Sequence, residues 1–183
     1  MAKIAQIREC SAILCEGLRI TVNCMQPRQH DRIDRAIATR LQSDGRIANV
    51  DLAGEVSLSP SACLRRVKAL EQDGIIAGYR AEVDRAKAGL GLTVFIAIKV
   101  EGHSRVTSDR IEAALISIPA VVACYLISGS ADFMVEAAVP DLAAYEQLLL
   151  GRILAIAGVT EAHSTFAIRT ILSRGPIPLD HWR

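Results

Sequence analysis

The segment SLSPSACLRRVKALEQDG, residues 57–74, concentrates cationic side chains on a stretch that also carries helix signals. Ser59 is a preferred N-cap residue, Pro60 loses no hydrogen bond at the first helical position, and Gly74 is a natural stop. The cations of the predicted helix are Arg65, Arg66 and Lys68. An arginine guanidinium presents a planar pair of donors that matches a phosphate or the O6 and N7 atoms of guanine. The segment is therefore predicted to recognise an anionic partner.

The apolar residues of the same segment indicate which side chains face outward. If Cys63, Val67 and Leu70 form the buried stripe, the small residues near the start of the helix allow its backbone to approach a DNA major groove. Free amides of the first turn and the helix dipole also favour a phosphate there. The predicted outward or flanking residues are Ser61, Ala62, Arg65, Arg66 and Ala69, with Lys68 directed to phosphate or solvent. A basic face that is merely solvated is the simpler alternative.

Two further helices are predicted ahead of this segment. Residues 30–44 carry an apolar residue at every fourth position behind Asp31, and residues 49–56 begin with Asn49, which is expected to cap the first turn. About three residues separate the last two helices, and the alternating segment 75–83 predicts a small β-ribbon. This arrangement is typical of a winged helix-turn-helix, in which Arg80 of the ribbon would reach the DNA backbone.

The rest of the chain has the pattern of a second domain. Residues 84–91 are polar and glycine-bearing and predict a linker. Strands and helices then follow in the order β-α-β-β-α-β, which is the ferredoxin-like split βαβ motif. The predicted elements are strand 92–100, helix 106–118, strands 121–128 and 132–140, helix 141–156 and strand 159–172. The predicted fold class is therefore α+β, with a winged helix-turn-helix followed by a ferredoxin-like domain.

Composition narrows the remaining classes of function. Of 183 residues, 51% are hydrophobic and 22% charged, and no apolar run approaches the ~20 residues of a membrane span. Net charge is only +1, but residues 28–80 carry nine Lys and Arg against seven Asp and Glu, whereas residues 81–183 carry nine against eleven. The five cysteines and four histidines show no metal-ligand spacing. We therefore expect a cytoplasmic protein without disulfide, metal or cofactor, whose N-terminal part meets an anion.

The first residues of the chain do not resemble a secretion signal, because charged side chains interrupt any apolar centre. Met25 offers a second start, and the periodic pattern begins only after it. We hypothesise that residues 1–24 are an upstream extension that is disordered or not translated, and we predict an N-terminal extension over residues 1–27.

The segments DGRIANVDLA, LSPSACLRRVKALEQDGIIAGY, LGLTVFIAIKV and CYLISGSADFM closely resemble the Lrp/AsnC family of bacterial and archaeal regulators, in a match over about residues 31–172. The resemblance implies a DNA-binding domain over 28–83, a ferredoxin-like effector and oligomerisation domain (RAM) over 92–175, and a tail at 176–183. It implies homodimers through the β-sheets, commonly assembled into octamers, that bind promoter DNA and respond to an amino acid or related metabolite. It implies a helix-turn-helix from Asn49 to Lys68 whose reading residues would be Ser59, Ser61, Ala62, Arg65 and Arg66. With Asn49, Lys68 and Arg80, these form the full set of predicted DNA-binding residues.

The sequence departs from the family in the helix-turn-helix and in the effector loop. Ser57 stands where the family usually has a glycine in the turn, which costs on the order of 1 kcal/mol if the position needs a positive φ. The loop SGSADFM, residues 128–134, matches the family's effector loop, so Asp132 would pair with an α-ammonium group. The implied effector residues are Gly129, Ser130, Ala131, Asp132 and Ser164. Ser130, Ala131 and Ala162 differ from the usual residues, and Asp132 could instead be only a turn acceptor.

Four functions follow as hypotheses. The first is a sequence-specific transcriptional regulator, and its alternative is a DNA-compacting architectural protein with weak sequence preference. An enzyme is not expected, because the sequence has no phosphate-cradling glycine loop, nucleophile elbow or metal spacing. A redox switch through Cys63 or Cys124 would require accessible thiols, whereas both positions read as buried hydrophobes.

Overall fold

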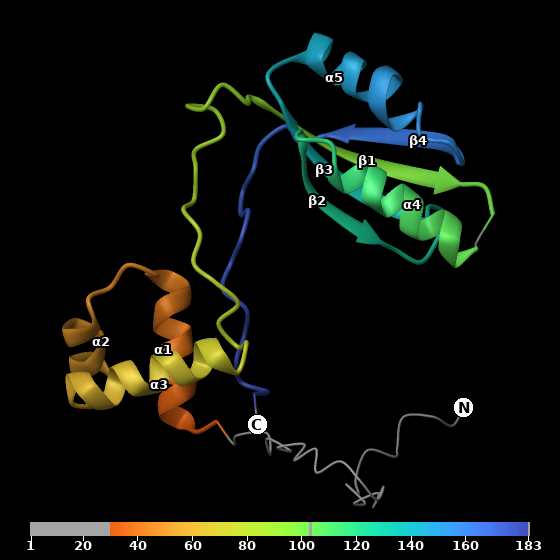
Figure 1. The fold of residues 1–183 in the computed structure, drawn as a ribbon. Coiled ribbons are helices and arrows are strands. Elements are labelled where there is room, and N and C mark those ends of the chain that lie inside the picture. The colour runs from red at the N-terminus through yellow and green to blue at the C-terminus, as the bar shows by residue number, and fades with distance from the viewer. Residues whose placement is uncertain (1–29, 103, 183) are drawn as a thin grey trace, which may run out of the picture. The chain divides into compact units, whose positions relative to one another are not determined.

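The computed structural model describes residues 30–102 and 104–182, which divide into two compact units (Figure 1). The helical unit comprises the described residues up to Leu70 together with those from Pro178 onward, and the sheet unit comprises Glu71–Ile177. The predicted extension over residues 1–27 lies outside the described residues.

Three short helices form the helical unit, as the periodicity predicts: α1 (Arg32–Ser43), α2 (Asn49–Glu55) and α3 (Pro60–Gln72). Asp31 caps α1, because its Oδ1 accepts hydrogen bonds from the amides of Ile33 at 2.9 Å and Asp34 at 3.0 Å. The amide of Asp31 in turn donates to Oδ2 of Asp34 at 3.2 Å, which completes a capping box. The start of α1 is therefore fixed by side chains that lie within one turn of each other.

A small apolar core holds the three helices together. Ile37, Leu52, Cys63 and Leu70 are each at most 2% exposed. The predicted burial of Cys63 and Leu70 on α3 is confirmed, and Val67 lies half-buried at the edge of the same stripe. The outward face of α3 is thereby fixed as well.

Two local predictions for this region are wrong. Asn49 does not cap α2, since the N-cap residue is Ala48 and no side chain caps the helix; Nδ2 of Asn49 instead donates to the Pro60 carbonyl oxygen at 2.9 Å. The ribbon predicted over 75–83 is not formed, because no strand lies between α3 and β1 (Leu92–Val100). A ribbon needs two paired strands, and this segment, which contains Gly78 at φ 155°, has no returning strand to pair with.

The turn between α2 and α3 contains backbone strain. Ser57 has a φ of 56° and is the only non-glycine residue at positive φ in the described part of the chain. A Cβ atom in the left-handed region clashes with the neighbouring carbonyl oxygen, so a serine here is less favourable than a glycine would be.

We expect Ser57→Gly to stabilise the helical unit by about 0.5–1 kcal/mol, less than the full relief of strain because glycine also adds entropy to the unfolded chain. Urea unfolding of the full chain measures this gain as a raised midpoint with an unchanged slope. Ser43→Gly is the matched control, because Ser43 lies in the last turn of α1, where glycine should destabilise. Equal shifts of both variants would contradict the assignment of strain to Ser57.

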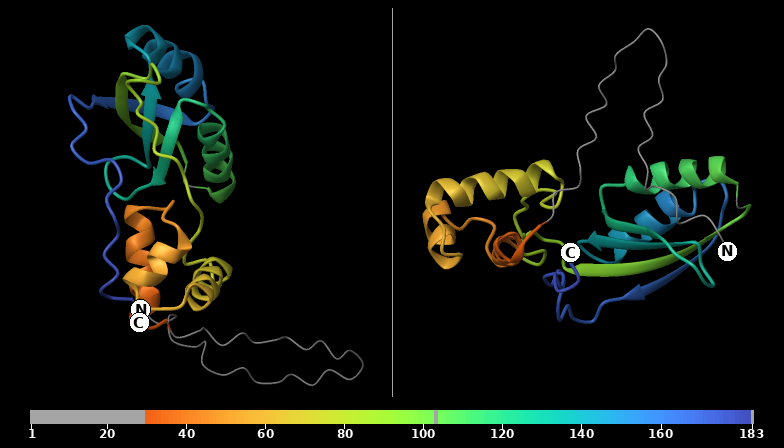
Figure 2. Two further views of the ribbon diagram at one scale, coloured as in Figure 1. Left: turned by 90° about the vertical axis from the view of Figure 1, so that its left-hand side faces the viewer. Right: turned by 90° about the horizontal axis from the view of Figure 1, so that it is seen from below.

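The sheet unit has the predicted β-α-β-β-α-β order. Its elements after β1 are α4 (Arg105–Ile116), β2 (Val121–Leu126), β3 (Phe133–Val139), α5 (Leu142–Leu148) with a π-helical turn η1 (Leu149–Ile153), and β4 (Val159–Phe166). The strands are antiparallel in the order β2-β3-β1-β4, which is the ferredoxin-like topology. Figure 2 shows α4 and α5 on one side of this sheet.

The register separates a covered face of the sheet from an open one. On the covered face, Val94, Ile96 and Ile98 of β1 are fully buried. They pack in one core with Ile111, Leu115, Phe133, Val135, Leu148 and Ile153. The intervening residues Phe95 and Lys99 point to the opposite face, because successive strand residues alternate between faces, and neither described helix of the sheet unit, α4 or α5, covers that face (Figure 2).

Two predicted elements of the sheet unit differ from their predicted bounds by more than two residues. The last strand ends at Phe166 rather than residue 172, because Phe166 pairs with Val94 near the start of β1 and the residues beyond it have little of the partner strand left. The predicted helix over 141–156 is α-helical only to Leu148 and continues as a π turn to Ile153. Asp141 caps this helix, because its side chain accepts from the Ala144 amide at 2.8 Å.

Candidate DNA-binding surface and effector loop

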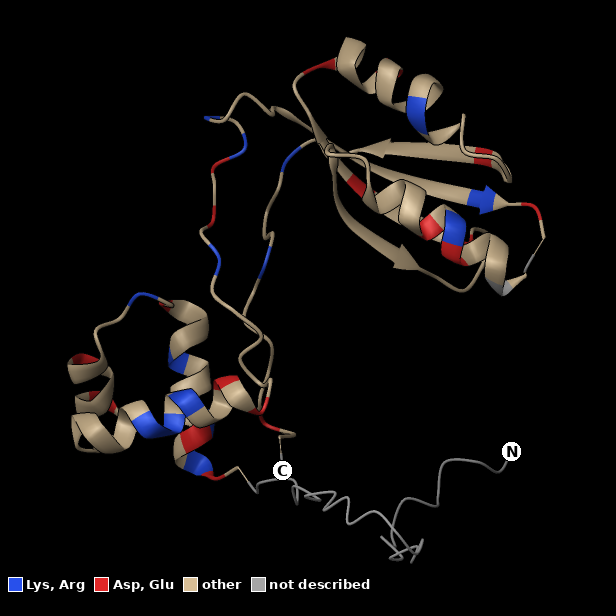
Figure 3. Cartoon of the chain, viewed as in Figure 1, with Lys and Arg blue, Asp and Glu red and all other residues tan. Residues whose placement is uncertain are grey.

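The outward face of α3 carries an exposed polar stripe. Ser61, Arg65 and Lys68 are all exposed, and their spacing of four and three residues places them on one side of the helix. Figure 3 shows the Lys and Arg positions of α3 as blue bands, among the other charged positions of the helical unit in blue and red. The predicted outward positions of Ser61 and Arg65 are therefore confirmed, and Lys68 shares their face.

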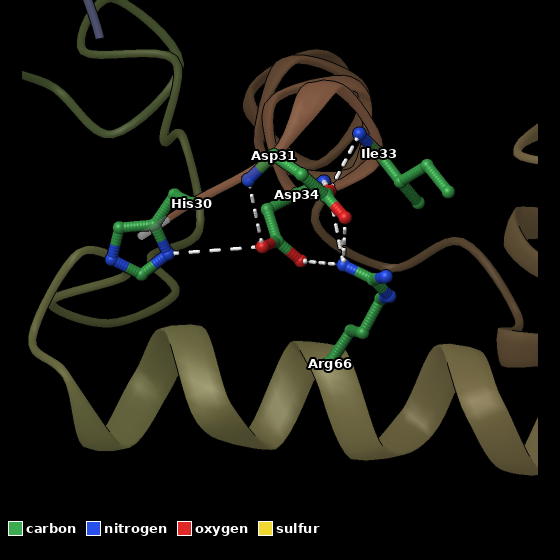
Figure 4. A network of polar contacts seen from close by, with 5 residues as sticks. All are labelled: His30, Asp31, Ile33, Asp34 and Arg66. Carbon is green, nitrogen blue, oxygen red and sulfur yellow. Dashed lines mark hydrogen bonds and ion pairs between the residues drawn. The ribbon is translucent and has the colours of Figure 1, made fainter. Parts of the chain in front are cut away.

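Arg66 faces a different direction from Arg65. Its Nη1 lies 2.7 Å from Oδ1 of Asp34 and 2.9 Å from Oδ2 of Asp31, so its guanidinium joins α3 to the start of α1 (Figure 4). The Asp34 side chain is 5% exposed, and Asp34 is the only charged residue among the described residues that is buried. A buried carboxylate requires such a partner, because desolvation of an unpaired charge is costly. In this structure Arg66 anchors α3 to the start of α1.

Sequence reasoning missed this pairing for a clear reason. The two carboxylates come from another helix, 32 and 35 residues earlier, and so they do not appear as the i, i+4 partners that a helix pattern reveals. The sequence did contain one relevant signal. Asp31 and Asp34 have the spacing of a capping box, which places two carboxylates at the start of α1, where a cation could pair with them.

Electrostatics of this cluster favours the charged forms. The pKa of Asp31 is lowered from its ordinary 3.8, chiefly because the Asp34 amide donates to its carboxylate, with Arg66 and the Ile33 amide adding to the effect against partial burial. The pKa of Arg66 is raised above its ordinary value, mainly by its hydrogen bond to Asp34. Asp31 and Arg66 are therefore both ionised at neutral pH in the folded chain.

Acid is expected to loosen the start of α1. A carboxyl whose folded-state pKa is lowered contributes stability above its unfolded-state value and loses that contribution as the pH falls through the folded-state value. We therefore expect the stabilisation from Asp31 to be complete at neutral pH and to disappear below pH 3.8. Urea midpoints of the wild-type chain and Asp31→Asn should converge there. A constant difference across the acid range would contradict this linkage.

Other predicted DNA-binding residues hold the helix-turn-helix together. Nδ2 of Asn49 bonds to the Pro60 carbonyl, which ties α2 to α3, and Oγ of Ser59 accepts from the Ala62 amide at 3.3 Å. Ser59 and Ser61 also share a hydroxyl–hydroxyl bond of 3.2 Å, so the first turn of α3 is ordered. Arg80 is exposed within the segment 75–83, which belongs to the sheet unit.

The predicted effector loop connects β2 to β3. Gly129 has a φ of 134°, and Gly129 and Ser130 are exposed, whereas Ala131 and Asp132 are half-buried. Oδ2 of Asp132 accepts from the Val100 amide at 2.8 Å, and the amide of Asp132 donates to the Ile98 carbonyl at 2.9 Å. Asp132 therefore joins the end of β1 to the loop through both its side chain and its backbone amide.

Ser164 lies on β4, on the opposite side of β1 from the loop. It pairs with Ile96, and so it faces the helix-covered side of the sheet, like Phe166 two residues later. Its Oγ is buried and has no hydrogen-bond partner among the described residues. A buried hydroxyl without a partner is unfavourable, which makes Ser164 a candidate to bind a polar group of a ligand.

The described cysteines are poor candidates for a redox switch. Cys63 is fully buried and Cys124 half-buried, and neither forms a disulfide. Burial raises the pKa of both thiols, and Glu112 raises that of Cys124 further, so both stay protonated and react slowly. Among the described residues, no cluster of His, Cys, Asp and Glu could hold a metal ion, and no helix could span a membrane.

Comparison with known proteins matches both units. Residues 30–77 match the winged helix-turn-helix DNA-binding model, and residues 93–177 match the Lrp/AsnC ligand-binding domain. The Bkd operon transcriptional regulator of Pseudomonas aeruginosa is 36% identical over 149 residues, which cover 81% of this chain and 97% of the relative. The leucine-responsive regulatory protein of Salmonella typhimurium is 38% identical over 134 residues, which cover 73% of this chain and 82% of that protein.

Solved structures give the same result. A transcriptional regulator from Neisseria meningitidis, solved as a complex with L-methionine, has a TM-score of 0.79 at 34% identity and covers 83% of this chain and 98% of its own. An AsnC family transcriptional regulator from Agrobacterium tumefaciens also has a TM-score of 0.79, at 36% identity, and covers 83% of this chain and 99% of its own.

Proposed function

The chain belongs to the Lrp/AsnC family of transcriptional regulators, and we propose on that basis that it binds promoter DNA through α3 and responds to an amino acid. The observation that carries the proposal is the exposed stripe of Ser61, Arg65 and Lys68 on a helix anchored from behind by Arg66. An exposed, positioned cationic helix after a short turn is what insertion into a major groove requires.

The residues of α3 divide into two groups in this proposal. Arg65 reads a base edge, because its guanidinium is exposed on the outward face, and Lys68 contacts phosphate as a point charge. Ser61 and Ala62 lie at the first turn, where amides and the helix dipole favour a phosphate. Asn49, Ser59 and Arg66 position the helix through the hydrogen bonds described above.

An amino acid is the effector class that we propose. The neighbour from Neisseria meningitidis was solved with L-methionine, and the Asp132 carboxylate would suit such a ligand by pairing with its α-ammonium group. Ser164 lies on the other side of β1 and faces the covered side of the sheet, so its buried Oγ would be a separate contact point for a polar group. Because Asp132 also holds the end of β1, a ligand bound there would act directly on the central strand of the sheet.

We further propose that the protein is a cytoplasmic homodimer, which can assemble into octamers, formed through the open face of the sheet. Phe95 is 39% and Tyr125 59% exposed, and the pairing of both strands with β3 puts them on this same face. A second copy of the face would bury these apolar side chains. Two-fold symmetry would present one α3 to each half-site of a palindromic promoter.

A competition titration tests the proposed function. The labelled upstream duplex of the chain's own gene is bound at fixed salt and competed with itself or with random duplex. A sequence-specific regulator should prefer its site by about 10³-fold or more, whereas an architectural protein should show nearly equal competition. An absence of salt-dependent binding to either duplex would contradict DNA binding altogether.

A thermal-shift screen of amino acids tests the effector assignment. A ligand that binds the folded chain raises the unfolding temperature according to its concentration and affinity. The shift should disappear in Asp132→Ala, and Asp141→Ala is the control, because Asp141 is a helix cap away from the loop. A full shift that persists in Asp132→Ala would show that the ligand binds elsewhere.

A further inference from the structure

The last residues of the chain pack on the helical unit, although they follow β4 of the sheet unit in sequence. From Ile168 to Trp182, only Leu179 and Trp182 are shielded from solvent. The amide of Trp182 donates to the Leu179 carbonyl at 3.1 Å, and this turn brings the two apolar residues together. Selective burial of these two side chains is the pattern of a docked segment.

Two contacts seat Trp182 against the start of α1. Its ring centroid lies 4.9 Å from that of His30, with 36° between the planes. Its carbonyl oxygen accepts a 2.6 Å hydrogen bond from Nη2 of Arg35, and a bond from a charged donor is stronger than one between neutral groups.

The docking site adjoins the residues that anchor the recognition helix. Nδ1 of His30 lies 3.9 Å from Oδ2 of Asp34, while Oδ1 of Asp34 accepts the 2.7 Å bond from Arg66 of α3. Figure 4 shows His30 and Arg66 on opposite sides of Asp34. The start of α1 therefore contacts the end of the chain on one side and the recognition helix on the other.

We propose that residues 178–182 are a strap that docks on α1 of their own chain and steadies the anchor of α3. The helical unit is then joined to the sheet unit twice, once after α3 and once through residues 167–177 after β4. The effect on DNA rests on the proposed function, whereas the docking itself does not.

Trp182 is the only tryptophan of the chain, so its fluorescence reports docking directly. In the full-length protein we expect acrylamide to quench Trp182 less than in the urea-unfolded chain. Arg35→Ala should raise the quenching toward the unfolded value, and His30→Ala should do the same. The matched control is Arg32→Ala, because Arg32 is exposed and lies one turn earlier on α1. Acrylamide should quench Trp182 in this variant as little as in the wild type. Wild-type quenching equal to that of the unfolded chain, or no change in Arg35→Ala, would overturn the docking.

Operator binding tests the coupling to α3. Trp182→Ala should weaken binding to the promoter duplex by roughly 3- to 30-fold, and Trp182→Phe, which keeps a ring, should bind like the wild type. Unchanged affinity in Trp182→Ala would overturn the coupling. Protection from quenching that falls on dilution would show that the strap docks on a partner chain, which contradicts docking within one chain. A wild-type protein that binds no duplex would remove the proposed function, while the quenching results would still decide the docking.

Discussion

Replacing Arg65 with alanine is expected to weaken binding to the promoter duplex by about 1–3 kcal/mol, or roughly 5- to 150-fold, with a smaller loss on random duplex. The reason is geometric: Arg65 lies on the exposed face of α3, and a bidentate contact to guanine discriminates between bases. Fluorescence anisotropy with both duplexes at one salt concentration measures the difference.

Lys68→Ala is the control for this experiment, because Lys68 lies on the same face and is assigned to phosphate. The Lys68→Ala variant should lose a similar factor of affinity for both duplexes. The slope of log affinity against log salt concentration should become shallower by about one. If Arg65→Ala lost affinity equally for the promoter and for random DNA, its role would be electrostatic and the reading of bases would have to come from elsewhere.

Replacing Arg66 with methionine is expected to destabilise the helical unit by about 2–3 kcal/mol. The change keeps most of the side-chain volume but leaves the buried Asp34 carboxylate without its cation. This loss is below the ~3–5 kcal/mol of a fully buried pair, because the Arg66 side chain is 24% exposed. Urea unfolding followed by Trp182 emission reports on the helical unit, to which Trp182 belongs.

A second substitution separates anchoring from DNA reading. Adding Asp34→Asn to Arg66→Met removes the unpaired charge and should recover part of the lost stability, so the two effects should not add. If Arg66 instead read bases, Arg66→Met would leave the unfolding midpoint unchanged and lower only the affinity for the promoter duplex. A stable Arg66→Met chain would therefore contradict the anchoring role.

The outward face of α3 and the anchoring of α3 differ in how far the sequence could predict them. Burial of Cys63 and Leu70 follows from helical periodicity, so the exposure of Ser61 and Arg65 follows too. Arg66 is adjacent to Arg65 and identical in chemistry, and about 100° of rotation separates the two on the helix. Only the crossing of α1 and α3 decided which of the two arginines meets the aspartates.

In the effector loop, too, local features could be predicted from the sequence, whereas contacts between strands could not. Gly129 at positive φ and Asp132 just before β3 are local features, and the sequence of residues 128–134 is enough to predict them. The bond from the Val100 amide to Asp132 and the unpartnered hydroxyl of Ser164 depend on which strands lie beside β1, and a pattern within one strand does not contain that information.

The sequence by itself determined the elements of this protein and their order: three helices, then β-α-β-β-α-β, with an aspartate at the start of α1 and at the start of α5. These signals lie within one turn or one strand, where periodicity and capping act. Only the tertiary structure decided the partners of Arg66, the bond of Asn49 to Pro60, the end of β4 at Phe166 and the docking of Trp182. Each of these joins separate elements of the chain, and the relative orientation of packed elements, which no local pattern encodes, sets the contact.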